Sequence, residues 1–271
     1  MPLLATVSVR ATERISPSFV RLVLGGPDLA DLGVDGPTYD QRFKLHLPCG
    51  TVRTYTIRDV RGSGAETRIV LDVVLHPGEH GPGSAWAASA AVGDEVKVLV
   101  PRRGQPFGGI EWDPGAADRL LLVADETAVP AVASILGALP GDARGAAFLE
   151  VPTPADLQDL RAPAGFSITW LPRSGAPVGS RVVAAVGEHL GFAAAAGAAD
   201  EVDPDLWETP TYSSSGETLT ARPARDGRYA WVAGESGMVT ALRRHLVRDL
   251  GLPRQQVAFM GYWRRGVAMR S

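Results

Sequence analysis

The stretch that sets the fold of this chain is RLLLVADETAVPAVASILGAL, residues 119–139. It opens with a continuous apolar run at 120–124, which is typical of a strand buried on both faces of a sheet. Residues 127–139 then place apolar side chains at helical spacing. A buried strand that leads directly into a helix is the building unit of parallel sheets. We therefore predict an α/β domain that begins at residue 116.

The same alternation continues toward the C-terminus. We expect an open parallel sheet with crossover helices, whose ligands lie at the carboxyl ends of the strands. The segment 193–228 is polar and rich in Gly, Pro and Ser, and we interpret it as a long, partly mobile surface insertion. The further predicted strands are 145–151, 166–173, 228–234 and 256–263, and the further predicted helices are 154–160, 180–190 and 235–251.

Toward the N-terminus the pattern changes to short Val-rich segments separated by Gly, Pro and Asp. Six such segments favour a small antiparallel β-barrel over residues 1–115, followed by the α/β domain over residues 116–271. One helix is expected inside the barrel domain, at 83–91. The six predicted strands are 5–15, 19–26, 42–48, 52–60, 68–76 and 95–101.

Composition narrows the class of protein. The chain has 271 residues, of which 45% are hydrophobic, so it can bury a substantial core. Its net charge of −3 gives no general attraction to nucleic acid. The single cysteine, Cys49, cannot form an internal disulfide, and the five histidines lack metal-ligand spacing, so no metal site is expected. Without a signal-peptide pattern or an apolar run of about 18 residues, we expect a cytoplasmic monomer with no membrane insertion.

The segment VRTYTIRDV, residues 52–60, is unusually polar for a strand. A solvated sheet face would explain it, since Thr and Tyr favour strands. A flavin site would explain it too, because Arg binds diphosphate and Tyr offers an aromatic face. Strand alternation places Arg53, Tyr55 and Ile57 on one face. Thr56 then points away, although its backbone N–H could still face a ligand.

RTYTIR at 53–58 resembles the Arg-x-Tyr-Ser/Thr signature of the ferredoxin–NADP reductase-like flavoproteins. Other segments narrow the resemblance to the siderophore-interacting protein family, the FAD-dependent ferric-siderophore reductases, over nearly the whole chain. These segments are DQRFKLHLP (40–48), LLLVADETAVPAVASIL (120–136), WLPRSGAP (170–177), WVAGESGM (231–238) and GYWRRG (261–266).

The resemblance implies an FAD site in the barrel domain. It assigns the diphosphate to His76 and the turn that opens the following helix, where free N–H groups suit an anion. For His76 a packed turn histidine is the alternative, and for Trp86 the alternative is a core aromatic. The implied FAD-binding residues are Arg53, Tyr55, Thr56, Ile57, Leu75, His76, Gly81, Pro82, Gly83, Ser84 and Trp86.

The α/β domain would then bind NADPH or NADH. No G-x-G-x-x-G is present, and we expect Thr127 and the N–H of Ala128 to contact the phosphates, with Asp125 or Glu126 as a helix cap. Related reductases place a Ser–Arg pair against the 2′-phosphate of NADPH. Arg173 and Ser174 could do the same, which favours NADPH, although an ordinary turn is the alternative.

Three residues are implied in catalysis: Thr56, Glu235 and Tyr262. Glu235 would orient the nicotinamide or cap its helix, and Tyr262 or Trp263 would shield the flavin. A C-terminal aromatic cluster that fills the core is the alternative. For the substrate we name a basic rim of Lys44, Arg264 and Arg265, each of which could instead be a surface charge.

The implied activity is reduction of a ferric siderophore. NAD(P)H gives up a pair of electrons and Fe(III) takes one at a time, and a flavin can convert between the two. Fe(II) is held far less tightly by the siderophore, so reduction releases the iron. The alternatives are a general flavin reductase, a reductase that takes electrons from ferredoxin, and a non-catalytic carrier of flavin or ferric chelate.

Overall fold

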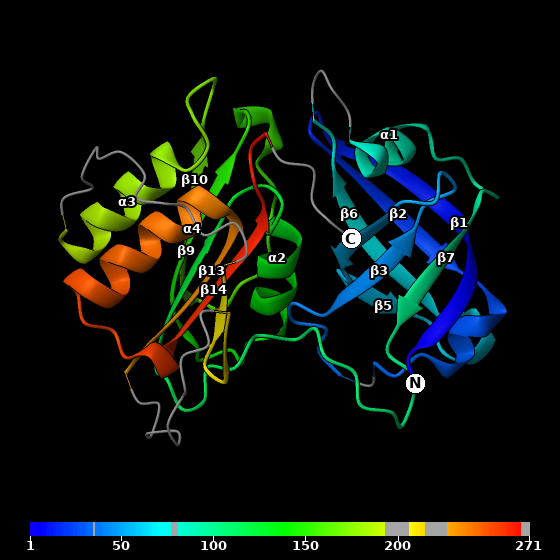
Figure 1. Ribbon diagram of the computed structural model, residues 1–271, viewed down its shortest axis with the longest axis horizontal. Helices are drawn as coiled ribbons and strands as arrows, with labels where there is room; N and C mark the ends of the chain where they lie inside the picture. The colour runs from blue at the N-terminus through cyan, green and yellow to red at the C-terminus, as the bar shows by residue number, and fades with distance from the viewer. Residues whose placement is uncertain (35, 77–80, 193–205, 215–226, 267–271) are drawn as a thin grey trace. The chain divides into compact units, whose positions relative to one another are not determined.

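The computed structural model describes residues 1–271 except 35, 77–80, 193–205, 215–226 and 267–271. The chain forms two compact units, whose main parts are Met1–Ile110 and the residues from Glu111 onward. The domain boundary predicted from the sequence, after residue 115, lies a few residues beyond this division. Each unit holds one seven-stranded sheet (Figure 1).

The sheet of the first unit is antiparallel throughout, in the order β4-β3-β7-β1-β2-β6-β5. One α-helix and two short 3-10 turns join its strands. The strands are β1 (Leu3–Ser16), β2 (Phe19–Gly25), β3 (Arg42–His46), β4 (Val52–Thr56), β5 (Asp59–Arg61), β6 (Arg68–Val74) and β7 (Glu95–Val100); the helices are α1 (Pro82–Ser89), η1 (Pro27–Asp31) and η2 (Gly64–Glu66).

The prediction of six strands is wrong by one, because residues 52–60 form two strands with different partners. β4 pairs with β3, and the N–H of Ile57 still donates to Gln41 O at 2.8 Å. The N–H of Arg58 donates instead to Val70 O at 2.8 Å, and β5 continues along β6. Since β3 and β6 lie next to opposite ends of the sheet order, this change of partner closes the sheet into a barrel.

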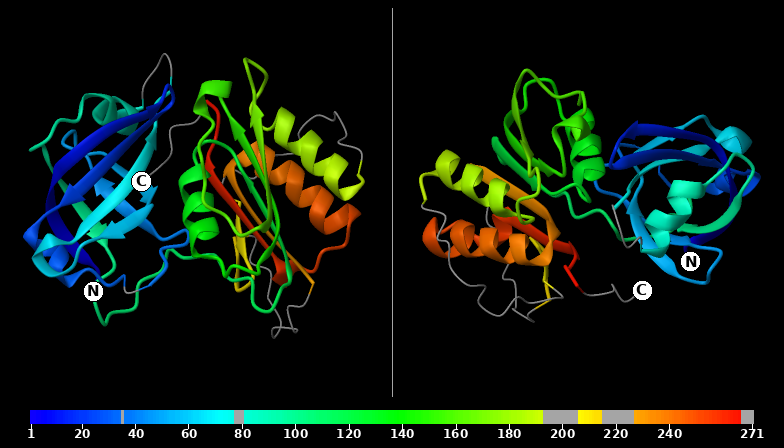
Figure 2. Two further views of the ribbon diagram at one scale, coloured as in Figure 1. Left: turned by 180° about the vertical axis from the view of Figure 1, so that it is seen from behind. Right: turned by 90° about the horizontal axis from the view of Figure 1, so that it is seen from above.

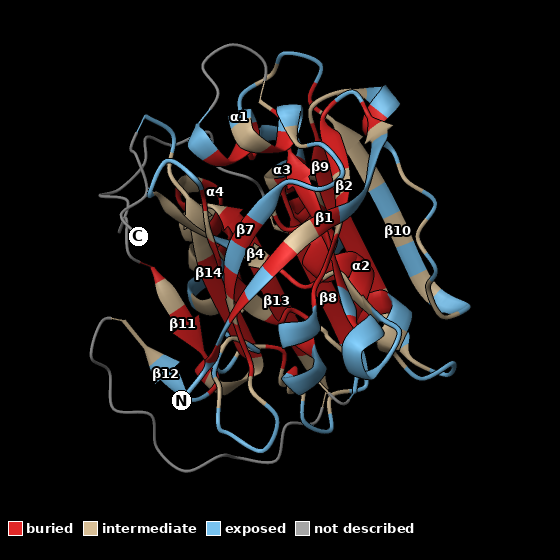
Figure 3. Ribbon diagram, turned by 90° about the vertical axis from the view of Figure 1, so that its right-hand side faces the viewer, coloured by how far each residue is buried: buried red, intermediate tan, exposed pale blue. Residues whose placement is uncertain are grey.

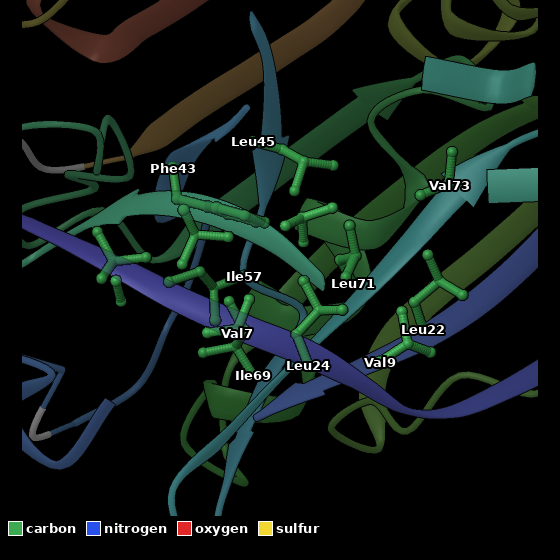
Figure 4. Close-up of a cluster of buried hydrophobic side chains, with 14 of the residues drawn as sticks. Val7, Val9, Leu22, Leu24, Phe43, Leu45, Ile57, Ile69, Leu71 and Val73 are labelled. Atoms are coloured by element: carbon green, nitrogen blue, oxygen red, sulfur yellow. The ribbon is translucent and has the colours of Figure 1, made fainter. Parts of the chain in front are cut away.

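The interior of the barrel is apolar because inward and outward residues alternate along each strand. In β1, for example, Ala5, Val7 and Val9 are buried between exposed or half-buried neighbours. Side chains from five of the strands, together with Ile57, meet in one cluster, which Figure 4 shows in close-up. This packed interior holds β4 and α1 in place around the candidate site described below.

The second unit is a doubly wound sheet in the order β10-β9-β8-β13-β14-β11-β12, in which the first five strands are parallel. Helices α3 and α4 cover one face and α2 covers the other (Figure 2). Its elements are β8 (Arg119–Ala124), α2 (Val129–Ala138), β9 (Arg144–Val151), η3 (Pro154–Asp156), β10 (Gly165–Pro172), α3 (Ser180–Leu190), β11 (Trp207–Thr209), β12 (Tyr212–Ser213), β13 (Arg228–Glu235), α4 (Ser236–Arg243), η4 (Arg244–Asp249), η5 (Arg254–Gln256) and β14 (Val257–Trp263).

The sheet is mixed rather than purely parallel, which corrects the prediction. The two additional strands, β11 and β12, lie inside the segment 193–228 that we interpreted as a surface insertion. β11 pairs antiparallel with β14, and its residue Glu208 is 1% exposed. Glu208 accepts two hydrogen bonds from Arg243 and forms an ion pair with Arg254, so this part of the segment is anchored. The remainder, 193–205 and 215–226, lies outside the described residues.

The helix predicted at 154–160 is also wrong, since only the single turn η3 forms there. Asp156 folds back onto Thr153 and accepts hydrogen bonds from its N–H at 3.0 Å and its Oγ1 at 2.7 Å. This capping box starts a helix that does not continue beyond its first turn. The connection from β9 to β10 is therefore largely irregular.

Burial follows the position of each strand in the second sheet. β8 and β13 are buried over most of their length, whereas β10 alternates between exposed and half-buried residues at the sheet edge (Figure 3). The buried apolar run that we used to place the α/β domain is thus β8, the middle one of the five parallel strands. Within the described ranges, no helix combines the length and the apolar character needed to span a bilayer.

Candidate functional site

In the barrel unit, the predicted residues of β4 and α1 are in contact at Gly83. A Cβ atom on Gly83 would lie 2.2 Å from Tyr55 Oη and 3.7 Å from Arg53 Cγ. The N-terminus of α1 can therefore approach the β4 side chains only because residue 83 has no side chain. Ser84 Oγ accepts a hydrogen bond of 3.2 Å from the N–H of His76, which links the same turn to the end of β6.

The first turn of α1 presents backbone N–H groups from Gly83 onward, since Pro82 has none. Gly81 is its N-cap, in extended conformation, and makes no side-chain cap hydrogen bond. The first N–H groups of a helix have no intrahelical acceptor, so they are suited to an anion. Half-buried Arg53, beside this turn, donates to Val52 O at 2.9 Å from Nη1, and within the described part of the chain the rest of its guanidinium is left for a ligand. The two groups together fit the diphosphate of FAD.

Tyr55 contributes an aromatic surface to the same site. Its ring packs partly buried against the barrel core, with its centroid 6.5 Å from that of Phe43. Burial raises the pKa of Tyr55 to about 12, and the charge of Arg53 opposes this only in part. The phenol is therefore neutral near pH 7 and can donate a hydrogen bond. The Tyr55 ring lies beside Arg53 and the N-terminus of α1. It is therefore suited to pack against the isoalloxazine or the adenine ring of FAD.

The other predicted FAD residues surround this group. Thr56 is buried, and Ile57 and Leu75 lie within the core cluster. Trp86 packs half-buried against the same cluster. Roles for these residues toward FAD stay predictions.

In the α/β unit, Asp125 joins the carboxyl ends of three neighbouring strands. It follows β8, is fully buried, and accepts hydrogen bonds at Oδ2 from the N–H of Glu235 in β13 and from Trp263 Nε1 in β14, each at 2.7 Å. Its Oδ1 accepts from the N–H and Oγ1 of Thr127, at 2.9 and 2.5 Å. The order of the strands reverses at β8, so this carboxyl group lies where an α/β sheet usually holds its ligand.

Burial and, to a smaller extent, the neighbouring charge of Glu126 raise the pKa of Asp125 to about 7. The hydrogen bonds from Thr127 and Trp263 favour the ionised form and partly oppose this shift. Asp125 therefore changes protonation near neutral pH.

Arg173 is held inside the α/β unit by carboxylates. It is 9% exposed and binds Glu126 through both terminal nitrogens, at 2.5 and 2.7 Å. Its Nη1 also lies 3.6 Å from Glu150, which is fully buried in β9. Glu150 in turn accepts from the N–H groups of Gly179, Arg181 and Val182 at the start of α3.

Other predicted nucleotide contacts also have internal partners. Thr127 donates to Asp125, and the N–H of Ala128 donates to Asp125 O at 3.1 Å. Glu235 caps α4 by accepting from the N–H of Met238 at 3.0 Å, which is one of its two predicted roles. Ser174, in contrast, is exposed and has a left-handed φ of 51°.

The predicted aromatic and basic residues occupy the following places. Tyr262 stacks on Trp207 with ring centroids 6.0 Å apart, and Arg264 follows β14, half-buried beside exposed Arg265. Lys44 is exposed on β3, where its Nζ donates to Thr54 Oγ1 at 2.8 Å. Across the parts of the chain that the structure describes, no group of three His, Cys, Asp or Glu residues could hold a metal ion.

Sequence reasoning missed Glu150. The available signal was a glutamate within an otherwise apolar buried strand, GAAFLEV. A charge at such a position needs a partner, because burial of an unpaired carboxylate is costly. The three N–H groups of α3 are that partner.

Comparison with protein families gives two matches. Residues 117–266 match the model described as siderophore-interacting protein. Residues 48–105 match the model described as siderophore-interacting FAD-binding domain, a range that contains both β4 and α1. The FAD-binding match therefore covers the contact between Tyr55 and Gly83.

Individual relatives agree with these matches. The ferric vibriobactin reductase ViuB of Vibrio cholerae is 30% identical over 214 residues, which cover 79% of this chain and 65% of that protein. The siderophore-interacting protein SipS from Aeromonas hydrophila has a TM-score of 0.71 at 27% identity, covering 98% of this chain and 94% of the other. A siderophore utilization protein from T. fusca has a TM-score of 0.70 at 30% identity with the same coverage. The chain also spans 64% of the length of a Mycobacterium tuberculosis relative that is 37% identical.

Proposed function

The chain belongs to the siderophore-interacting protein family, and on that premise we propose that it is an FAD-dependent reductase that transfers electrons from a pyridine nucleotide to a ferric siderophore. The observation that carries the proposal is the contact of Arg53 and Tyr55 with the first turn of α1. It combines a cation, an aromatic ring and the backbone N–H groups of a helix start, the three features that a flavin dinucleotide requires.

Bound FAD would accept an electron pair and release single electrons. The overall reaction would convert one NAD(P)H and two ferric siderophores into NAD(P)⁺, a proton, two ferrous ions and two iron-free siderophores. In this proposal Arg53 and the α1 N–H groups bind the diphosphate, and Tyr55 supports a ring. Thr56 would act through its backbone N–H, because its side chain is buried.

The substrate would be an anionic chelate of Fe(III), attracted by exposed or half-buried cations. Lys44, Arg264 and Arg265 are the cations that we propose for this role. The name of the Vibrio relative, a ferric vibriobactin reductase, supports this class of substrate. A cytoplasmic location, where pyridine nucleotides are available, forms part of the same proposal.

A ferredoxin-fed reductase is a second candidate. It is favoured by one observation: the N-termini of α3 and α4 have internal carboxylate caps in Glu150 and Glu235, and Asp125 accepts from the N–H of Thr127 just before α2. These helix ends are therefore less available to the phosphates of a pyridine nucleotide than uncapped ends would be.

The test begins with the absorption spectrum of the purified protein, which should show an oxidised flavin after incubation with FAD. Anaerobic NADH or NADPH should bleach this band, and subsequent addition of a ferric siderophore with a ferrous trap should restore it and colour the trap. Bleaching by reduced ferredoxin alone would select the second candidate. A protein that takes up no FAD would overturn both.

A further inference from the structure

The α/β unit carries a feature that bears on which pyridine nucleotide it accepts. In doubly wound sheets the dinucleotide lies across the carboxyl ends of the strands, at the point where the strand order reverses. That point here is β8, with β9 and β10 on one side and β13 and β14 on the other. In such sheets a carboxylate near the end of the second strand binds the ribose 2′-hydroxyl of NAD, whereas a nearby arginine accommodates the 2′-phosphate of NADP.

The arginine next to these strand ends, Arg173, is already paired. Both of its terminal nitrogens bind Glu126, which is 1% exposed, and Arg173 itself is 9% exposed. The turn that carries it is fixed as well, since the N–H of Arg173 donates to Val151 O at 2.8 Å. A 2′-phosphate could bind this guanidinium only after displacing a buried carboxylate from it.

The charge balance at this edge is unfavourable to a second phosphate. Two buried carboxylates, Glu126 and Glu150, face one guanidinium, and Asp125 adds a third carboxyl group at the end of β8. The donors at the start of α3 cannot compensate, because Glu150 accepts hydrogen bonds from three of them. Another cation near β9 and β10 is Arg181, which is exposed in the first turn of α3.

We propose that Glu126, supported by Glu150, makes this strand edge selective for a dinucleotide without a 2′-phosphate, so that NADH rather than NADPH is the electron donor. This inference rests on the proposed function. It reverses the preference for NADPH suggested by the sequence around Arg173, and it makes Arg173 the counter-ion of Glu126. Glu126 acts through Arg173 and the local charge, and is a positioning residue.

The first experiment compares kcat/KM for NADH and NADPH in the FAD-loaded protein, with a ferric siderophore as acceptor. We expect a value at least tenfold higher for NADH. In Glu126→Gln, which removes one charge and one acceptor of Arg173, the NADPH to NADH ratio should rise at least tenfold. The ratio is the readout, because a general loss of stability lowers both rates together.

Two further variants serve as controls. Glu188→Gln removes the same charge from an exposed position of α3 and should leave the ratio unchanged. Arg181→Ala tests the exposed cation, and it should also leave the ratio unchanged. A preference for NADPH in the wild type, or an unaltered ratio in Glu126→Gln, would overturn the inference.

The second experiment needs no reduction. Calorimetric titration of the FAD-loaded protein should show tighter binding of ADP-ribose than of 2′-phospho-ADP-ribose, and Glu126→Gln should narrow this difference. If neither dinucleotide reduces the protein but ADP-ribose still binds preferentially, the proposed donor reaction fails and the selectivity stands. Equal binding, or binding of neither compound, would refute the selectivity.

Discussion

The indole Nε1 of Trp263 donates a hydrogen bond of 2.7 Å to Asp125 Oδ2. Trp263 ends β14 and Asp125 follows β8, and β13 lies between these two strands. The same oxygen accepts from the N–H of Glu235 at the end of β13. A single buried carboxyl group thus holds together the carboxyl ends of β8, β13 and β14. Its protonation state therefore affects the stability of this edge of the sheet.

We predict that Asp125 makes the free energy of unfolding fall as the pH rises from about 5 to 8. Its pKa is about 7 when folded against an ordinary value of 3.8, so in this range the folded state retains a proton that the unfolded state has lost. The stabilisation is complete below the unfolded value and is lost as the pH approaches 7. Between pH 5 and the folded pKa there are about 2 units, and at about 1.4 kcal/mol for each unit the free energy of unfolding falls by roughly 3 kcal/mol.

The measurement is urea denaturation at several pH values for the wild type and for Asp125→Asn, which cannot titrate. The free energy of unfolding of the wild type, minus that of Asp125→Asn, should decrease as the pH rises. Trp263→Phe removes one hydrogen-bond donor to the ionised carboxylate of Asp125. It should therefore make the free energy of unfolding fall more steeply with pH. Parallel pH curves for the wild type and Asp125→Asn would show that this group does not titrate in the range.

Much of the fold could be predicted from local patterns. The apolar run at 120–124 and the helical spacing after it identified β8 and α2. The pattern could not show that residues 52–60 change partners from β3 to β6, because hydrogen-bond partners far along the chain decide this. It also could not show that Glu208 anchors β11, since its two arginine partners lie on later elements.

The candidate site, too, could be predicted from the sequence only in part. Arg53, Tyr55 and Gly83 were all named from the sequence, and the structure brings them together. Arg173 was named as well, but its partner could not be predicted, because Glu126 is 47 positions away in the chain. Sequence spacing predicts which residue types gather at a strand end, whereas side-chain pairing depends on packing.

We expect Gly83→Ala to reduce FAD binding. The added methyl group would lie 2.2 Å from Tyr55 Oη, so either α1 or the tyrosine must shift. Flavin content per chain and the Kd for FAD, from quenching of flavin fluorescence, measure the effect, and we expect at least a tenfold loss of affinity. The double variant Gly83→Ala with Tyr55→Phe lacks the clashing hydroxyl and should regain part of the lost FAD affinity.

Gly81→Ala is the matched control for this substitution. Gly81 has a φ of −61°, and among the described residues a Cβ atom there would meet nothing within 4 Å. The variant should bind FAD as the wild type does. Equal affinities for Gly81→Ala and Gly83→Ala would argue against a site between the first turn of α1 and β4.

We expect Arg53→Ala to weaken FAD binding by one to two orders of magnitude, because a charge-assisted hydrogen bond to a phosphate contributes about 1.5–3 kcal/mol. The loss of FAD affinity in Arg53→Ala should be smaller at high salt, because salt already screens the Arg53–phosphate interaction in the wild type. Arg61→Ala is the control, since Arg61 lies on β5 of the same unit with 54% of its side chain exposed. The Kd for FAD at two salt concentrations tests both variants, and equal losses would remove Arg53 from the site.

Glu208 should be among the most sensitive positions for stability outside the candidate sites. Its side chain is 1% exposed and pairs with Arg243 at 2.6 Å and Arg254 at 3.1 Å. Removal of one partner from a buried ion pair leaves an uncompensated charge, which costs about 3–5 kcal/mol. Glu208→Gln should therefore lower the free energy of unfolding by this amount in urea denaturation of the α/β unit. Asp59→Asn breaks an ion pair with 46–54% exposed side chains, and should cost less than about 1 kcal/mol. Similar costs for the two variants would mean that β11 is not held by its arginine partners.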